Sequence, residues 1–207
     1  MNEIEQRASA EFMAVAQRAW QRGLVAGSGG NISLRLPGSE RILIKPSGVA
    51  GVDCRPEDLL LVDLQGRVVG RRGRPSKDLN FHLAIYKVRA DVQGIVHAHV
   101  PWATALTLLG YRELPLLTPH AQAKLRRVPV VPFAPSESQA LEELITAAFH
   151  SQDLLAALLE RHGLVTVGPT LTTAENLAEL VEESAQIAWL VANGGKELRH
   201  SAELGAR

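Results

Sequence analysis

Residues 94–100 read Gly-Ile-Val-His-Ala-His-Val, and this stretch decides most of what the sequence predicts about the fold. Ile95, Val96 and Val100 are β-branched and apolar, which favours a strand. Successive side chains of a strand point to opposite faces, so residues two apart share a face. His97 and His99 are therefore predicted to project together, at a separation that suits two ligands of one metal ion.

The two histidines admit more than one interpretation. Two neutral imidazoles suit zinc or another borderline divalent metal. The same pattern also fits a polar strand face, or two histidines that are simply hydrogen-bonded. A further histidine, His162, precedes Gly163 at the mouth of the strand predicted over 164–167. It would complete a three-histidine site with one open position, as catalytic zinc needs, but spacing alone does not bring it to the other two.

On both sides of this stretch, apolar periodicity predicts helices and strands in alternation. Helical spacing predicts two long helices and three shorter ones: residues 4–23, 172–193, 78–88, 102–109 and about 136–149. Alternation predicts short strands, with a hairpin at Gln65-Gly66: residues 32–36, 41–44, 59–64, 67–70, 94–100, 128–133 and 164–167. Strands come first and then alternate with helices, so we expect a layered, mixed α/β domain.

The two long helices are predicted to be amphipathic. In the first, the apolar residues at near-helical spacing are Ile4, Phe12, Val15, Ala16, Ala19 and Trp20. In the second, one face carries Leu177, Leu180, Val181 and Ala185. Such a face is the one that a surface helix buries.

Composition narrows the class of protein. The chain has 207 residues, of which 46% are hydrophobic and 21% charged, as in ordinary globular proteins. Lys+Arg and Asp+Glu both number 22, so the basic excess typical of a nucleic-acid binder is absent. There is no apolar run of membrane-spanning length, and residues 1–5 do not resemble a signal peptide. We therefore expect neither a nucleic-acid nor a membrane partner.

Cysteine usage points to a reducing compartment. Cys54 is the single cysteine, which excludes an intrachain disulfide and a zinc site built from cysteines. A cytoplasmic protein is the simplest interpretation. We expect one domain over residues 1–207, in which the polar segment 196–207 is a flexible or subunit-contacting tail.

A carboxylate candidate lies just before the helix predicted over 78–88. In Arg-Pro-Ser-Lys-Asp, residues 74–78, Ser76 or Asp78 fits an N-cap, which is the simplest role for either. Two other roles fit Asp78: a fourth metal ligand displaced by substrate, or a base beside the metal. His82 lies four residues on, on the same helix face, and is expected to pack or to support the site rather than to bind metal.

Glycine and hydroxyl groups in three segments predict an anion site. Residues 27–31, Gly-Ser-Gly-Gly-Asn, offer backbone N–H groups, a hydroxyl and an amide. Residues 45–48, Lys-Pro-Ser-Gly, and Ser76 offer two more hydroxyls. Such groups suit phosphate oxygens, although each segment alone also fits an ordinary turn. The P-loop pattern does not occur.

Taken together and in order, these motifs resemble the class II aldolase/adducin family. The matching motifs are Gly-Ser-Gly-Gly-Asn-Ile-Ser (27–33), Lys-Pro-Ser-Gly (45–48), Pro-Ser-Lys-Asp (75–78), His-Ala-His (97–99) and Arg-His-Gly-Leu-Val-Thr-Val-Gly (161–168). The resemblance covers about residues 5–195, and the combination is specific although no single motif is. It implies a three-layer αβα domain around a mixed, largely antiparallel central sheet, usually a homotetramer, that binds Zn²⁺ or another divalent ion such as Mn²⁺ or Co²⁺.

The resemblance also implies roles for individual residues. It implies that His97, His99 and His162 are metal ligands. The residues that it implies around a substrate phosphate are Ser28, Gly29, Asn31, Ser47, Gly48 and Ser76. The family's acid/base glutamate falls on Asp78, and an aspartate there is similar to the ribulose-phosphate epimerase branch.

Three positions depart from the family pattern. The epimerase branch has a catalytic aspartate in a His-Ala-Asp run, whereas Gln122 follows His120-Ala121 here. The fuculose-phosphate aldolases have a tyrosine proton donor in this region, and the nearest match is His120 or Pro119, which makes His120 a candidate proton carrier. Lys77 replaces the usual second serine of Pro-Ser-Ser and resembles the branch that decarboxylates 3-oxo-tetronate 4-phosphates. Lys77 either neutralises a substrate carboxylate or phosphate, or is solvated at the helix start.

The chemistry shared by these branches makes or breaks a carbon–carbon bond next to a carbonyl, through an enediolate that a metal stabilises. The resemblance therefore implies a metal-dependent carbon–carbon lyase, an aldolase or a decarboxylase, for a phosphorylated sugar or sugar acid. Asp78 would move a proton. The alternatives are a sugar-phosphate 4-epimerase and, from a different class, an adducin-like structural protein, against which the three histidines argue.

Overall fold

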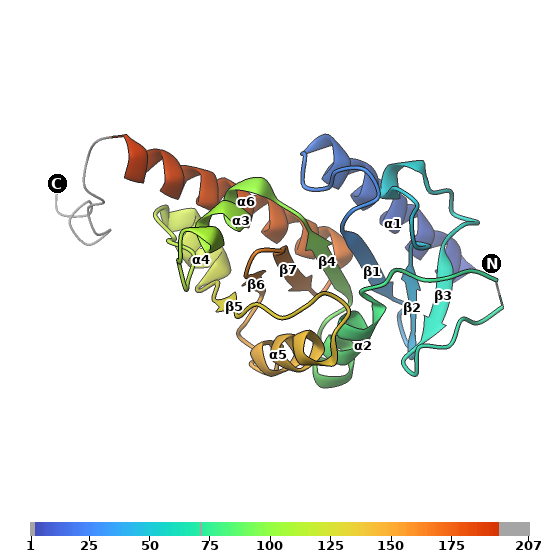
Figure 1. The fold of residues 1–207 in the computed structure, drawn as a ribbon. Coiled ribbons are helices and arrows are strands. Elements are labelled where there is room, and N and C mark those ends of the chain that lie inside the picture. Colours follow the sequence, from blue (N-terminus) through green and yellow to red (C-terminus); the bar gives the residue numbers. More distant parts are fainter. Residues whose placement is uncertain (1–2, 71, 195–207) are drawn as a thin grey trace.

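A mixed sheet of seven strands runs through the computed structural model, which describes residues 3–70 and 72–194 (Figure 1). The strands are β1 (Asn31–Arg35), β2 (Arg41–Ile44), β3 (Leu60–Asp63), β4 (Gly94–Ala98), β5 (Val130–Val131), β6 (Ala156–Leu159) and β7 (Gly163–Gly168). Their order across the sheet is β3-β2-β1-β4-β7-β6-β5. All neighbours are antiparallel except β5 and β6, which are parallel. The predicted mixed, largely antiparallel sheet is confirmed.

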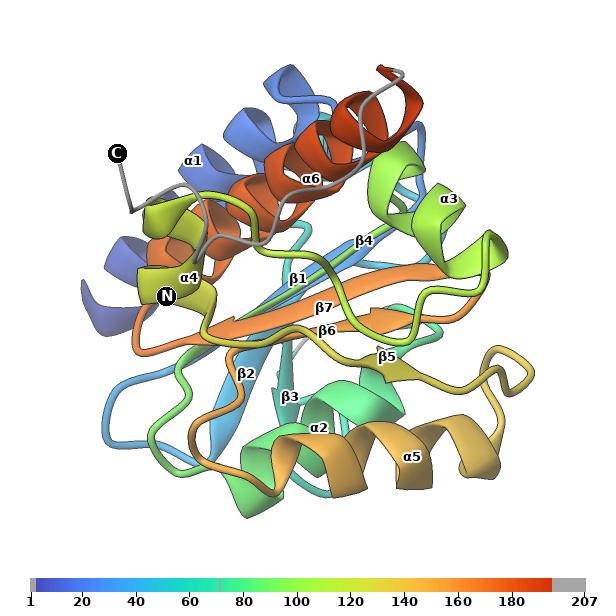
Figure 2. The same cartoon turned by 90° about the vertical axis from the view of Figure 1, so that its left-hand side faces the viewer.

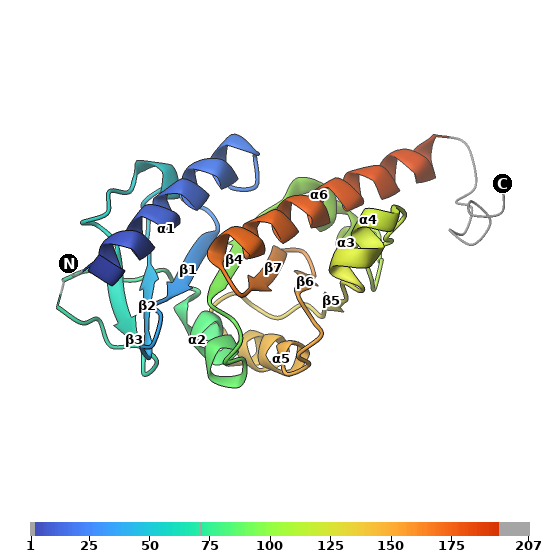
Figure 3. The same cartoon turned by 180° about the vertical axis from the view of Figure 1, so that it is seen from behind.

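Helices cover both faces of the sheet. They are α1 (Glu3–Gln21), α2 (Leu79–Val88), α3 (Pro101–Leu108), α4 (Pro119–Leu125), α5 (Gln139–Phe149) and α6 (Leu171–Asn193), with a short 3₁₀ turn, η1 (Gly51–Asp53). Figure 2 shows α1, α3, α4 and α6 on one side of the strands and α2 and α5 on the other. In Figure 3, the long helix α6 crosses over β4 and β7. The architecture has the three layers that were predicted.

Two apolar clusters fill the spaces between the layers. Val96 of β4 packs toward α1 and α6, and Ile95 packs toward α2 and α5. Because side chains alternate along a strand, His97 lies on the face of Ile95 and meets the edge of the Phe81 ring of α2. None of the helices within the described ranges is long and apolar enough to cross a membrane.

The two long helices bury most of the predicted faces. In α6, Leu177, Leu180, Val181 and Ala185 are all buried. In α1, the prediction was wrong for Ile4 and Trp20, which are 50% and 49% exposed. Each lies eight residues from the buried Phe12, about 2.2 helical turns. Seen down the helix axis, their side chains therefore point about 80° away from the direction of Phe12, one on each side.

Three elements were not predicted, β6, α4 and η1, and of the predicted strands one is absent and another is shorter. Strand β6 reads Ala-Ala-Leu-Leu and is buried on both faces, so it lacks the alternation of a half-buried strand. Helix α4 is only seven residues long, although Thr118 caps it and a proline occupies its first position. Residues 67–70 contribute only a single bridge from Val68 to Val62, and the strand predicted over 128–133 shrinks to β5. The predicted tail over 196–207 lies outside the described residues.

Candidate metal centre and substrate pocket

Three histidines converge where β4 ends and β7 begins, at one end of these two interior strands. His97 lies near the end of β4, His99 directly follows that strand, and His162 lies in the turn between β6 and β7. One ring nitrogen from each lies within 4.8 Å of the others. Nε2 of His97 and Nε2 of His99 are 3.1 Å apart. We call these three residues the histidine cluster; the structure brings together the three side chains that the sequence nominated.

Two glycines allow the backbone to close around His97. A Cβ atom at Gly30, where φ is +60°, would lie 2.7 Å from the carbonyl oxygen of His97. A Cβ atom at Gly163 would collide with the carbonyl oxygen of Ala98, well inside the 3.0 Å limit of real contacts. Only glycine fits both positions without a shift of the backbone. The second of them lets the turn that carries His162 approach the end of β4.

A hydrogen bond fixes the orientation of the His97 ring. Nδ1 of His97 lies 2.9 Å from the backbone oxygen of Leu164. Since a carbonyl oxygen can only accept, Nδ1 must carry the proton. The neutral ring then presents the lone pair of Nε2 toward His99 and His162. This is the second contact that a metal-binding histidine ordinarily makes.

Burial keeps the histidine cluster in the form that binds a cation. Burial lowers the pKa of His97 well below its ordinary value, and the neighbouring His162 and His99 lower it further. The pKa values of His99 and His162 are also lowered, mainly by burial, and nearby Asp78 partly offsets this. Neutral imidazoles are the ligand form for zinc and similar divalent ions. The donor set therefore fits such an ion.

Asp78 points to the histidine cluster rather than to its own helix. It occupies the N-cap position of α2, yet its side chain makes no capping hydrogen bond. Its Oδ2 instead accepts a hydrogen bond of 2.7 Å from Nδ2 of Asn31 and lies 3.9 Å from Nε2 of His97. The N-cap interpretation of Asp78 was wrong, because a tertiary contact takes its carboxylate.

Lys45 ties two of the predicted phosphate-binding segments together. Its Nζ donates to the backbone oxygens of Ser28, at 3.1 Å, and Val49, at 2.9 Å. The side chain is buried, and this burial lowers the pKa of the ammonium group. No carboxylate in the described chain lies within ion-pair distance of it. No role of its own was predicted for Lys45, because in Lys-Pro-Ser-Gly only Ser47 and Gly48 were expected to bind phosphate.

The third segment joins through backbone hydrogen bonds. The N–H of Ser47 donates to Arg74 at 2.8 Å, and the N–H of Ser76 donates to Lys45 at 3.3 Å. Gly29 lies against the ring of His99, since a Cβ atom there would be 3.0 Å from Nδ1. The residues predicted around a phosphate thus come from adjoining segments beside the histidine cluster: Ser28, Gly29, Asn31, Ser47, Gly48 and Ser76.

His82 is buried behind the histidine cluster and is not one of its members. Its Nδ1 lies 2.7 Å from Oγ of Ser33, which in turn lies 2.9 Å from the hydroxyl of Tyr86. Burial is the main cause that lowers the pKa of His82 to about 3, and His97 adds to it. His82 is therefore a neutral packing residue, as expected.

The other two candidate catalytic residues lie differently. Lys77 forms an ion pair of 3.1 Å with Glu137, and both side chains are about half exposed. His120 is exposed on α4 and lines a cavity of about 510 Å³ together with Arg22, which directly follows α1, and with residues of α6 such as Asn176. That cavity is lined by residues of α4 and α6, and these helices lie on one side of the sheet (Figure 2), whereas His97 contacts Phe81 of α2 on the other side. The structure does not bring His120 to the histidine cluster of the same chain.

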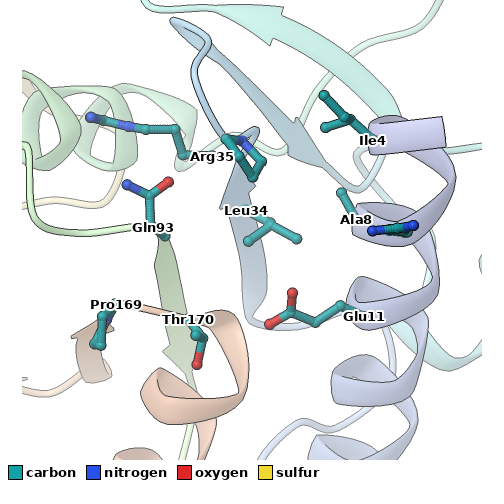
Figure 4. Close-up of a pocket in the computed structure, with 10 residues that line it drawn as sticks. Ile4, Ala8, Glu11, Leu34, Arg35, Gln93, Pro169 and Thr170 are labelled. Carbon is teal, nitrogen blue, oxygen red and sulfur yellow. The ribbon is translucent and has the colours of Figure 1, made fainter. Parts of the chain in front are cut away.

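A further cavity, of about 390 Å³, lies at the other end of these strands, where β4 begins and β7 ends (Figure 4). It is lined by α1, by Leu34 near the end of β1 and by Gln93 just before β4. Glu11 points into this region and accepts hydrogen bonds from the N–H groups of Leu171 and Thr172 at the start of α6. None of the predicted site residues lines this cavity.

Comparisons with known proteins agree with these motifs. Residues 10–189 match the family described as "Class II Aldolase and Adducin N-terminal domain". L-fuculose phosphate aldolase from Methanococcus vannielii is 34% identical over 181 residues, which cover 87% of this chain and 95% of the relative. 3-oxo-tetronate 4-phosphate decarboxylase from Escherichia coli is 32% identical over 202 residues, which cover 95% and 92%. The crystal structure of L-fuculose-1-phosphate aldolase from Thermus thermophilus has a TM-score of 0.81 and 30% identity, over 94% of this chain and all of that one.

Proposed function

The chain belongs to the class II aldolase and adducin family, and from this premise we propose that it is a metal-dependent carbon–carbon lyase for a phosphorylated sugar or sugar acid. One observation carries the proposal. Three neutral imidazoles converge within 4.8 Å, and the carboxylate of Asp78 lies 3.9 Å from Nε2 of His97. A lyase needs a cation site beside a group that moves protons, and these four side chains would supply both in one place.

His97, His99 and His162 would hold the metal, and we propose Zn²⁺ as the ion. The all-imidazole donor set supports this, although Mn²⁺ and Co²⁺ are the alternatives that such ligands also accept. When bound, the ion would polarise the substrate carbonyl as a Lewis acid. Nδ1 of His97 carries the proton and donates it in a hydrogen bond to the backbone oxygen of Leu164, so the lone pair of Nε2 stays directed at the ion site.

Asp78 is the proposed acid/base. Asn31 holds its Oδ2 by a hydrogen bond, so the carboxylate stays directed at the cluster and not at the N–H groups of α2. From there it would give a proton, taken up from the substrate hydroxyl in aldol cleavage or from water in decarboxylation, to the carbon at which the bond breaks, once an aldehyde or carbon dioxide has left. Asn31 would thus have two roles, in orienting Asp78 and in binding the substrate.

The phosphate would lie on the His99 side of the cluster. The proposed contacts are the hydroxyl, amide and glycine N–H groups of Ser28, Gly29, Asn31, Ser47, Gly48 and Ser76. Lys45 supports this assignment, because its ammonium group lies among these segments without a carboxylate partner in the described chain. Buried positive charge favours the binding of a dianion there.

We propose a homotetramer, in which His120 serves a site of another copy. His120 and the histidine cluster of one chain lie on opposite sides of the sheet, so His120 can act as proton carrier only across an interface. Exposed Leu108, Leu109 and Leu190 support an apolar interface on the α3 and α6 side. Light scattering should give four times the mass of the chain; a monomer with full activity would remove His120 from the mechanism.

The proposed activity is tested by a substrate screen. Protein loaded with Zn²⁺, Mn²⁺ or Co²⁺ is incubated with phosphorylated ketoses and 3-oxo acids, and aldehyde and carbon dioxide are measured. We expect turnover that a chelator abolishes and that His97→Ala lacks. His150→Ala is the matched control, because His150 lies outside the cluster, at the end of α5, and should leave activity unchanged. An epimerised product without cleavage would replace the lyase by the 4-epimerase alternative.

We also propose a cytoplasmic location, where phosphorylated sugars are retained by their charge.

A further inference from the structure

The short helix α3 connects two of the three histidines of the cluster. It begins at Pro101, two residues after His99, and a residue near its end is bonded to the turn that carries His162. His97 is fixed differently, because it lies inside β4 and its ring is bonded to Leu164. In the part of the chain that the structure describes, the rings of His99 and His162 make no hydrogen bond outside the cluster. Their positions therefore depend on the backbone around them.

A carboxylate of α6 fixes the start of α3. Oε1 of Glu182 accepts the N–H of Trp102, and Oε2 accepts the N–H of Ala103, both at 2.9 Å. Val100 occupies the N-cap position without a side-chain acceptor, and Pro101 has no N–H of its own. Glu182 thus does what an N-cap residue ordinarily does. Because α6 packs across β4 and β7, this contact fixes the start of α3 relative to the sheet (Figure 3).

A threonine near the other end of α3 fixes the turn of His162. Oγ1 of Thr107 donates to the backbone oxygen of Thr104 at 2.7 Å and accepts the N–H of Arg161 at 3.0 Å. The one hydroxyl proton is used in the first bond, so a lone pair is available for the second. Arg161 has a φ of +65°, in the left-handed region, which arginine adopts only where the surrounding structure requires it. The bond to Thr107 is one contact that meets this requirement.

The two contacts lie toward opposite ends of one rigid element. Helix α3 has eight residues, a length of about 12 Å. A change at its start would shift His99, and a change near its end would release the turn of His162. Zinc takes imidazole nitrogens at about 2.0–2.1 Å, so a small shift of either ligand would weaken binding of the ion.

We propose that Glu182 and Thr107 are positioning residues of the ion site, which act through α3 to set the spacing between His99 and His162. This inference rests on the proposed function and deepens it, because it names what fixes two of the three proposed ligands. Loss of either contact should lower the affinity for a divalent ion in a way that an equal loss of stability elsewhere in the chain does not.

The first test compares two carboxylates that cap helices in the same way. Glu11 accepts the N–H groups of Leu171 and Thr172 at the start of α6, away from the histidine cluster. Glu182→Gln and Glu11→Gln each remove the charge and leave a single acceptor oxygen. Each should therefore lower the thermal midpoint of the metal-free protein by no more than about 4 °C. Only Glu182→Gln should weaken the binding of Zn²⁺, by ~10-fold, as measured by competition with a chromogenic chelator.

The second test compares two threonines. Thr146 donates to the backbone oxygen of Glu142 at 2.6 Å within α5, as Thr107 does within α3, but it accepts no hydrogen bond from another element of the described chain. Thr107→Val should weaken Zn²⁺ binding ~10-fold and change the visible absorption of bound Co²⁺, which depends on ligand geometry. Thr146→Val should change neither. Thr107→Ser keeps the hydroxyl and should retain the affinity of the wild type.

Each other outcome has a definite meaning. If Glu182→Gln and Thr107→Val bind Zn²⁺ as tightly as the wild type does, the inference is overturned while the metal centre stands. Equal losses in Glu11→Gln and Thr146→Val would also overturn it, because the cause would then be general destabilisation. If the wild type binds neither Zn²⁺ nor Co²⁺, the proposed function fails, and the roles of Glu182 and Thr107 fail with it.

Discussion

Nδ2 of Asn31 donates a 2.7 Å hydrogen bond to Oδ2 of Asp78, and this contact joins the first residue of β1 to the residue that precedes α2. It gives Asp78 a partner outside its own helix. The N-cap position of α2 is thereby left without a side-chain cap, which ordinarily contributes about 1 kcal/mol. The chain forgoes that local stabilisation and keeps a carboxylate beside His97.

Asp78→Asn should separate catalysis from stability. If Asp78 transfers a proton, turnover should fall by ~10²–10⁴ while the thermal midpoint barely moves, because Asp78 caps nothing. Steady-state kinetics and calorimetry measure the two effects. Thr170→Ala is the opposite control: Thr170 does cap α6, so this change should cost about 1 kcal/mol of stability and leave turnover intact. Near-normal turnover in Asp78→Asn with metal bound would move the search for the proton carrier to His120.

Lys45→Met should weaken phosphate binding. The ammonium group lies among the Ser28 and Ser47 segments, and its loss should raise KM for a phosphorylated substrate ~10–100-fold. Inhibition by inorganic phosphate should weaken in parallel. Lys87→Met, on the exposed end of α2, is the control and should change neither quantity. If Lys45→Met left phosphate inhibition as it is in the wild type, the phosphate would have to bind elsewhere.

Gly163→Ala should disrupt the turn that carries His162. The new methyl group would collide with the oxygen of Ala98, and the backbone would have to shift to make room for it. This overpacking should destabilise the protein by about 1–3 kcal/mol. Metal content should fall as well, because His162 must move away from His97. Denaturant unfolding and elemental analysis measure both. In the control Gly51→Ala, the new atom would meet only the methyl group of Ala16 at 3.4 Å, so neither quantity should change much.

Glu175 should make the stability depend on pH. Its side chain is fully buried in α6, and burial, together with the neighbouring Glu179, raises its pKa to about 8. A carboxyl group whose folded-state pKa is raised binds more protons in the folded state than in the unfolded one. The contribution of this group to stability should therefore be fully present below about pH 4.5, and should be lost as the pH rises from there through about 8.

Glu175→Gln should remove that dependence, because an amide has no proton to lose. At pH 8 the variant should be more stable than the wild type by at least about 1 kcal/mol, the equivalent of one pKa unit. Urea unfolding between pH 5 and 9 measures this difference. Glu183→Gln, at an exposed position on the same helix, should follow the wild-type profile. Parallel profiles for wild type and Glu175→Gln would show that Glu175 is ionised in the folded protein.

Local rules explain what could be predicted from the sequence. The strand around His97 and the faces of α6 follow from periodicity within a few residues. The approach of His162 to His97 does not, because it depends on the pairing of β7 with β4, in which Leu164 and His97 are 67 residues apart. The direction of the Asp78 side chain was misjudged for the same reason, since the cap is a local preference and Asn31 is a distant partner. The resemblance to a known family, and not periodicity, implied that His162 joins His97 and His99.

The strand order also bears on how the protein is made. β7 lies between β4 and β6, so one of the last strands to leave the ribosome enters the middle of the sheet. A nascent chain that ends before His162 has only two histidines of the cluster, and the β4 edge that β7 later covers stays unpaired. Metal capture and protection of that edge are therefore both delayed until synthesis is nearly finished, and premature termination yields a chain that is prone to associate and cannot complete its ion site.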